Sequence, residues 1–213
     1  MRSARMILSV VFVFLFAALP TWAQASGVPD PTLSTAWLAH EGPEPLTLMI
    51  TPDGTGGYFS DARTPDGTPA DATVTLLLMD PSNSPIVNFP HEDLWIQAEN
   101  GGIAFCGIYD MGADVNTGPD GQTIWSRRPK GGGYSQGPML VYINGNPLTG
   151  PPLELYFNSP DISGDGRVSL GDVTFFAIDF YGEFHLRSDL HRDGVLNLSD
   201  VIPLANWMGR RCE

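Results

Sequence analysis

Short runs of alternating apolar and polar residues, separated by marked turns, fill the chain from residue 26 to about residue 158. A period of two is typical of β-strands, because successive side chains point to opposite faces of a sheet. The turns contain Pro-Asp-Gly three times and Asn-Gly twice, which are sequences that favour tight reversals. We predict seven strands, over residues 46–50, 72–79, 94–98, 103–109, 122–126, 139–143 and 153–157.

After residue 160 the period changes to that of a helix. Apolar residues recur at i, i+3, i+4 and i+7 in two stripes, and the second stripe begins 28 residues after the first. The stripes are Val173, Phe176, Ala177 and Phe180, then Val201, Leu204, Ala205 and Met208. The fold class we predict is therefore mostly β with a small α C-terminal module, whose two helices pack together through these stripes.

Each predicted helix follows a twelve-residue acidic segment, residues 161–172 and 189–200, and the two segments are also 28 apart. An EF-type calcium loop presents oxygen ligands from positions 1, 3, 5, 7, 9 and 12, with glycine at position 6. Gly166 and Gly194 stand at position 6. The ligand positions are Asp161, Ser163, Asp165, Arg167 (backbone carbonyl), Ser169 and Asp172 in loop one, and Asp189, His191, Asp193, Val195 (backbone carbonyl), Asn197 and Asp200 in loop two.

The pattern predicts two calcium sites, of which the second is weaker. His191 offers an imidazole at position 3, and imidazole suits softer metals than calcium. Position 8 is apolar in both loops, Val168 and Leu196, as expected if the loops pair with each other.

Residues 159–211 resemble a dockerin, the paired calcium-loop module of secreted bacterial proteins, in which position 12 is usually Asp. Asp172 and Asp200 follow that rule. The resemblance implies calcium-dependent docking onto a cohesin-like domain or a neighbouring subunit, through loop positions 10 and 11 and the following helix. Carried over, the partner-binding residues are Leu170, Gly171, Leu198 and Ser199, where the best-known members often have Ser-Thr.

The first 25 residues have the features of a secretory signal peptide. Arg2 and Arg5 precede an apolar run, and Ala23-Gln24-Ala25 supplies an A-x-A cleavage site after Ala25. The apolar run is too short for a comfortable membrane span, so we expect a secreted or cell-surface protein without one. The expected divisions are residues 1–25 (signal peptide), 26–158 (β domain) and 159–213 (calcium module).

The β domain loosely resembles bacterial immunoglobulin-like domains, through residues 74–87, 114–126 and 141–145. The resemblance implies an Ig-like β-sandwich. No catalytic motif is present: His91-Glu92-Asp93, for example, lacks the second histidine of a zinc-protease helix. We therefore expect no enzyme.

The alternatives are a carbohydrate-binding module, with a platform formed by aromatic residues, and a self-assembling surface-layer or filament subunit. The aromatic candidates are Trp37, Trp95, Trp125, Tyr58, Tyr134 and Tyr142, although a tryptophan within a strand-like run also suits the core.

Charge and cysteine content narrow the partners further. The chain has 24 acidic residues against 11 Lys and Arg, a net charge of −13. Nucleic acids and anionic membranes bind basic surfaces, so neither is expected as a partner. The two cysteines, Cys106 and Cys212, either form a disulfide that ties the C-terminus to the first domain or leave Cys106 as a buried thiol.

Overall fold

In a computed structural model that describes residues 27–107 and 110–213, the chain is mostly β with two short α-helices. This composition confirms the fold class predicted from the pattern. The expected signal peptide, residues 1–25, lies outside the described residues. Within the described ranges, neither helix has the length and apolar content needed to cross a membrane.

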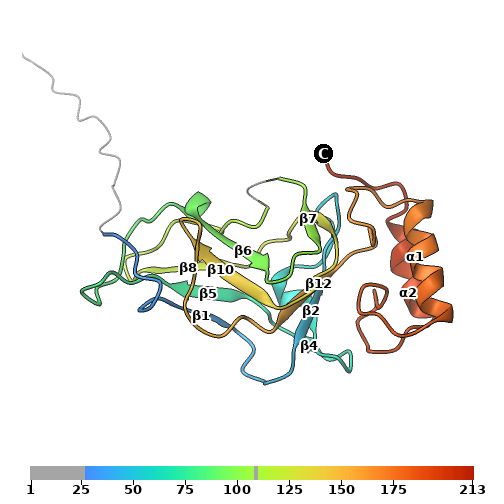
Figure 1. Ribbon diagram of the computed structural model, residues 1–213, viewed down its shortest axis with the longest axis horizontal. Helices are drawn as coiled ribbons and strands as arrows, with labels where there is room; N and C mark the ends of the chain where they lie inside the picture. The colour runs from blue at the N-terminus through green and yellow to red at the C-terminus, as the bar shows by residue number, and fades with distance from the viewer. Residues whose placement is uncertain (1–26, 108–109) are drawn as a thin grey trace, which may run out of the picture.

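The strands of the described residues form four sheets (Figure 1). One has the order β1-β5-β8 and another the order β11-β10-β6. A third has the order β12-β2-β3-β4, and β7 pairs with β9. Their bounds are β1 Thr35–Leu38, β2 Leu46–Met49, β3 Ala62–Arg63, β4 Pro69–Ala70, β5 Val74–Leu77, β6 Leu94–Ala98, β7 Ile103–Phe105, β8 Gln122–Trp125, β9 Gly131–Gly133, β10 Met139–Ile143, β11 Asn146–Pro147 and β12 Leu155–Asn158, with 3₁₀ helices at Phe59–Asp61 and His91–Asp93.

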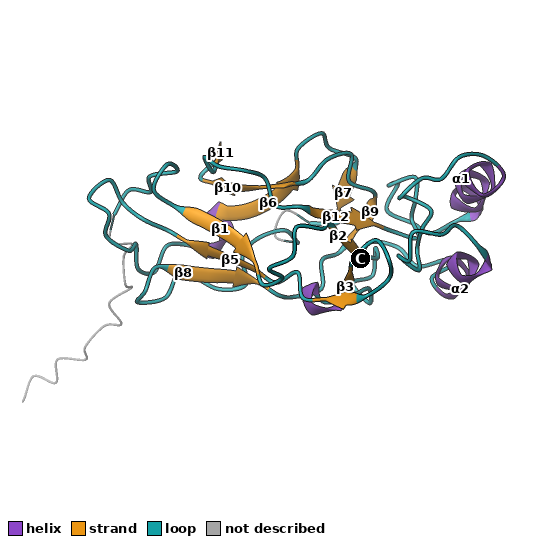
Figure 2. Ribbon diagram, turned by 90° about the horizontal axis from the view of Figure 1, so that it is seen from below, coloured by secondary structure: helices purple, strands orange, loops and turns teal. Residues whose placement is uncertain are grey.

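The strands alternate as the sequence predicts. In β5, β6 and β10 every second side chain is buried, and these side chains belong to one apolar core with β2, β12 and Trp125 of β8. Figure 2 shows the sheets containing β5 and β10 as separate layers. Each of the seven predicted runs contains a strand, although residues 108 and 109 of one run lie outside the described residues. The pattern missed β1, the two-residue strands β3, β4 and β11, and β9, whose Gly-Gly-Gly sequence has no side-chain alternation.

The last strand of the β domain, β12, pairs in parallel with β2 at one edge of the third sheet. Leu155 pairs with Leu46 and Asn158 with Met49, and the Ile50 N–H donates to the Asn158 carbonyl. Because the first acidic loop begins three residues after β12 ends, this pairing holds the loop against the β domain without a linker.

The two helices, α1 (Leu170–Tyr181) and α2 (Leu198–Asn206), lie side by side at the end of the molecule remote from β8 (Figure 1). A second apolar core lies beneath them and contains Phe176, Leu204 and Met49 of β2, with Ile162, Val168 and Leu190 of the loops. The predicted stripe is only partly confirmed in α2, because Val201 and Met208 are exposed and Leu204 alone is buried. The stripes therefore pack mainly onto the loops and β2.

The expected pairing of the two loops through position 8 is wrong for the first loop. Val168 pairs instead with the C-terminal segment, donating its N–H to the Arg210 carbonyl and accepting from the Gly209 N–H. The Cys212 N–H also donates to the Gly166 carbonyl. The chain end thus forms a short antiparallel contact with loop one.

Cys106 and Cys212 form a disulfide, with a Cα–Cα distance of 5.3 Å. Of the two alternatives drawn from the sequence, the structure shows the bridge. The bridge closes a segment of 106 residues. It joins the residue after β7 to the C-terminal segment that pairs with loop one. The disulfide therefore joins the β domain covalently to the C-terminal module, residues 159–213.

Replacing both cysteines by serine should destabilise the protein by about 2 to 5 kcal/mol, since the bridge restricts the unfolded chain over a long loop. Urea unfolding of the oxidised mature chain and of the double variant, both at saturating calcium, measures the change. The single variants Cys106→Ser and Cys212→Ser are controls and should each lose as much as the double variant. An unchanged midpoint in the double variant would contradict the coupling.

Candidate metal centre

Loop one is organised around the carboxylate of Asp161, at position 1. Its Oδ1 accepts the N–H groups of Gly164 (3.0 Å) and Asp165 (3.2 Å), and its Oδ2 accepts that of Gly166 (2.8 Å). The chain can turn this tightly because Gly164 and Gly166 have φ of 70° and 86°, a region that costs glycine little. The loop sequence therefore encodes a nest of N–H donors around one carboxylate.

Loop two repeats this arrangement 28 residues later. Oδ1 of Asp189 accepts the Asp193 N–H (3.2 Å), and Oδ2 accepts the Gly194 N–H (2.9 Å). The repeat that is visible in the sequence is thus a repeat of backbone geometry as well.

Position 9 of each loop is the N-cap of the following helix, and position 12 lies in its first turn. Ser169 and Asn197, at position 9, are N-caps whose side chains accept from Gly171 and Ser199. Position 12 closes a capping box, because Asp172 Oδ2 accepts the Ser169 N–H (2.7 Å) and Asp200 Oδ2 accepts the Asn197 N–H (2.8 Å).

The other oxygen of each position-12 carboxylate reaches position 3 of its own loop. Asp172 Oδ1 accepts the Ser163 N–H at 2.9 Å, and Asp200 Oδ1 accepts the His191 N–H at 2.8 Å. One carboxylate in each loop therefore joins the loop to its helix.

Four of these carboxylates are buried without a basic partner. Asp161, Asp172 and Asp200 are fully buried and Asp189 is 2% exposed, yet no ion pair involves them in the part of the chain that the structure describes. Burial raises the pKa of Asp161, and the charges of Asp172 and Asp165 act in the same direction. A buried carboxylate is costly unless a cation or hydrogen bonds compensate its charge.

The donors fit a hard cation, although the structure does not gather each loop's three carboxylates as closely as expected. Among residues 27–107 and 110–213, no group of three or more His, Cys, Asp and Glu side chains has the arrangement of a metal site. Instead, Asp165 and Asp193 accept the N–H groups of Arg167 and Val195, at 3.0 and 3.1 Å. What favours calcium is the chemistry of the donors: carboxylate, hydroxyl and carbonyl oxygens with uncompensated negative charge.

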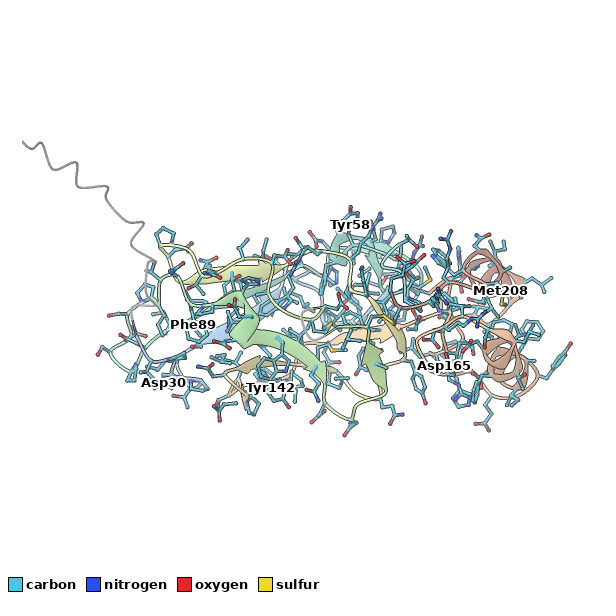
Figure 3. The ribbon with its side chains drawn as sticks, turned by 90° about the horizontal axis from the view of Figure 1, so that it is seen from above. Asp30, Tyr58, Phe89, Tyr142, Asp165 and Met208 are labelled. Carbon is cyan, nitrogen blue, oxygen red and sulfur yellow. A yellow bond between two sulfur atoms is a disulfide. The ribbon has the colours of Figure 1, made fainter. Side chains whose placement is uncertain are left out.

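Both loops face the β domain. The Asp161 carbonyl accepts the Gly133 N–H, and a Cβ at Gly132 would collide with the Asp161 carboxylate. In loop two, Asn158 Nδ2 donates to the Asp189 carbonyl (2.6 Å), and a Cβ at Gly194 would meet the Pro65 carbonyl at 2.5 Å. Figure 3 shows Asp165 at this boundary between the strands and the helices.

The helices carry exposed apolar side chains at the positions that the dockerin resemblance implied for a partner. Leu170 is 78% exposed and Leu198 is 73% exposed. Gly171 is exposed beside Leu170, and Ser199 is half-buried beside Leu198. Further apolar residues continue the surface along both helices: Ile178 and Tyr181 in α1, Val201 and Ile202 in α2. We call these six apolar residues (Leu170, Ile178, Tyr181, Leu198, Val201 and Ile202) the helix surface.

Sequence reasoning missed a buried ion pair that joins α1 to the segment just before loop two. Asp179, 2% exposed, accepts two hydrogen bonds from Arg187, both at 2.7 Å, and one from Ser188 at 2.6 Å. Burial alone would raise the pKa of Asp179, but the bonds from Arg187 and Ser188 hold it below its ordinary value. The signal was an acidic residue seven positions after Asp172, on the same helix face as Phe176.

The six aromatic residues considered for a sugar platform do not form one surface. Trp125 fills the core and donates its indole N–H to the Met111 carbonyl (2.9 Å). Arg128 covers the Tyr58 ring at 4.0 Å from its centroid, and Trp95 stacks on Tyr142 with centroids 5.5 Å apart. The tryptophans and tyrosines are therefore distributed over separate parts of the molecule.

No family model matches the chain, and no curated protein matches it. Among solved structures, the crystal structure of the Lin-41 filamin domain has a TM-score of 0.30 with this chain at 13% identity. The match covers 61% of this chain and 97% of the filamin domain. A likeness of this size supports no conclusion about function.

Replacing Asp179 with Asn should destabilise the protein by about 3 kcal/mol at pH 7, because Arg187 would lose its charged partner in a buried site. The lowered pKa of Asp179 means that its contribution is complete above the unfolded value of about 4 and disappears as the pH falls through the folded value. Urea unfolding at several pH values should therefore show the difference between wild type and Asp179→Asn shrinking as the pH is lowered from about 5 to 2.

The matched control for this charge change is Asp120→Asn, at an exposed turn carboxylate. It should leave the free energy of unfolding within about 0.5 kcal/mol of wild type, as for most surface substitutions. Equal effects of the two substitutions at pH 7 would show that the Asp179–Arg187 pair has no special role.

Proposed function

We propose that this chain is a secreted, non-catalytic protein, an Ig-like β-sandwich followed by a dockerin-type calcium module, and that it docks a protein partner in a calcium-dependent manner. The observation that carries the proposal is the division of the module into two sides. Its acidic loops contact the β domain, whereas the two helices that carry the apolar helix surface lie at the far end of the molecule. Exposed apolar patches of this kind are typical of binding surfaces.

Calcium links the two sides because the same carboxylates belong to the loops and to the helix starts. Asp161, Ser163, Asp165, Arg167, Ser169 and Asp172 would hold one ion, and Asp189, Asp193, Val195, Asn197 and Asp200 a weaker second one, with His191 exposed to solvent. The ion would compensate the buried negative charge. Since Asp172 and Asp200 close the capping boxes of α1 and α2, calcium would stabilise the orientation of the helix surface.

A cohesin-like domain is the partner that the helix surface suits best. Leu170 and Leu198 occupy equivalent loop positions in the two repeats, so the surface has two similar halves. An apolar partner surface would bury both leucines, and burial of each contributes about 1.5 to 3 kcal/mol. The departure from Ser-Thr at these positions indicates a more apolar partner surface than the best-known dockerins bind.

Calcium titration of the mature chain, residues 26–213, should give two sites, the first tighter than the second. Asp161→Asn should remove the tight site and Asp189→Asn the weak one. Each substitution should weaken its site by at least about a hundredfold, since a carboxylate touching a cation contributes several kcal/mol at an effective dielectric near 20. Isothermal titration calorimetry measures both affinities. Asp71→Asn, which neutralises an exposed turn carboxylate, is the control and should bind like wild type.

Docking is tested by capture of partners from the secreted and surface fraction of the source cells, with the mature chain as bait, in calcium and in chelator. The expected result is a partner retained only in calcium and lost when Leu170 and Leu198 are both replaced with serine. Val28→Ser, at a residue that is 75% exposed and lies before β1, outside the C-terminal module, should retain the partner. A partner that survives chelation or the double replacement would overturn the proposal. Concentration-dependent self-association without a partner, seen by sedimentation, would favour a self-assembling subunit instead.

A further inference from the structure

A cavity of about 420 Å³ lies between the β domain and the C-terminal module. The β domain contributes the segment from Thr55 to Arg63, and the module contributes Arg192 of loop two and Trp207 at the end of α2. Its volume is within the range of small-molecule sites, about 300 to 1,000 Å³. Because its walls come from segments more than 120 residues apart, only the docked arrangement creates it.

Two guanidinium groups line this cavity in a strongly acidic protein. Arg192 donates from Nη1 to the Asp61 carbonyl at 2.8 Å, and Arg63 donates from Nη1 to the Gly67 carbonyl at 2.7 Å. Within the described ranges neither arginine forms an ion pair with a carboxylate, and the buried Nε of Arg192 has no hydrogen-bond partner. The Asp61 carboxylate, also at the cavity, accepts the Tyr58 N–H at 2.9 Å. The cavity therefore has two cationic groups and one anionic group.

The backbone conformation at Arg192 is unfavourable for a residue with a side chain. Arg192 has φ of 60°, a region where a side chain costs energy, and the equivalent position of loop one is Gly164 with φ of 70°. Arg192 is half-buried and its Nε is buried, and the guanidinium of an arginine is protonated at neutral pH. Loop two thus holds a charged, partly desolvated side chain where glycine would suffice for the turn.

The remaining wall is aromatic and well fixed. The Trp207 indole N–H donates to the Thr55 hydroxyl at 2.8 Å, and that hydroxyl donates to Asp53 at 2.7 Å. Planar guanidinium groups bind carboxylates through paired hydrogen bonds, and indole rings contact the apolar face of a sugar ring. We propose that this cavity binds an acidic sugar, with the uronate carboxylate on Arg63 and Arg192 and the sugar ring against Trp207.

The test uses the mature chain in saturating calcium, titrated with galacturonate and, separately, with galactose and acetate. Isothermal titration calorimetry gives affinities, and the indole N–H resonance of Trp207 reports contact in the cavity. We expect galacturonate to bind saturably and to shift that resonance, and we expect galactose and acetate to bind at least tenfold more weakly. Arg192→Gly, which copies Gly164 of loop one, and Arg63→Gln should each weaken galacturonate binding at least tenfold.

Arg211→Gln removes an exposed guanidinium of the same module and should bind galacturonate like wild type. Thermal unfolding and calcium titration confirm that each variant is folded, and Arg63→Gln tests the site even if Arg192→Gly is unstable. Absence of saturable galacturonate binding, or binding unaffected by Arg63→Gln, would overturn the proposal. Acetate binding as tight as galacturonate would show a simple anion site and would also overturn it. None of these outcomes depends on the protein partner.

Discussion

The burial of negative charge at the boundary between strands and helices is the constraint on which the rest of this structure depends. Asp161, Asp172, Asp189 and Asp200 lie inside the protein, and within the described residues their carboxylates accept hydrogen bonds mainly from backbone N–H groups, with the Ser163 hydroxyl as a further donor to Asp161. Such a nest requires tight turns, which explains the glycines at position 6. It also requires helices whose N-caps stand at position 9, because the capping boxes complete the hydrogen bonding of Asp172 and Asp200.

The β domain contributes directly to the packing of the loops and helices. The parallel pairing of β12 with β2 delivers loop one directly to the glycine strand β9. Met49 contributes to the core beneath the helices, and Asn158 bonds to loop two. Together with the Cys106–Cys212 bridge, these contacts make the C-terminal module part of one packed unit with the β domain. A packed module of this kind holds the helix surface in one direction, which would lower the entropy cost of the docking proposed above.

The same packing creates features that neither part would have alone. The Asp179–Arg187 pair fastens α1 to the segment before loop two, and the cavity beside Arg192 exists only where that loop meets the β domain. Negative charge is concentrated in the two loops and positive charge in the cavity beside Arg192, so the net charge of −13 describes neither of these regions.

The sequence by itself determined the strand positions, the two helices and the repeat of the loops, because those features depend on periods of two or 3.6 residues and on turn residues close together in the chain. The N-cap roles of Ser169 and Asn197 came from the structure, since the sequence had indicated these residues only as calcium-loop ligands. Only the tertiary structure decided that Val168 pairs with the C-terminal segment, that Cys106 meets Cys212 and that Trp125 is a core residue. It alone showed Asp179 bound to Arg187 and Arg192 beside Arg63. Those outcomes depend on which distant segments pack together, and an amino-acid pattern carries no direct measure of that distance.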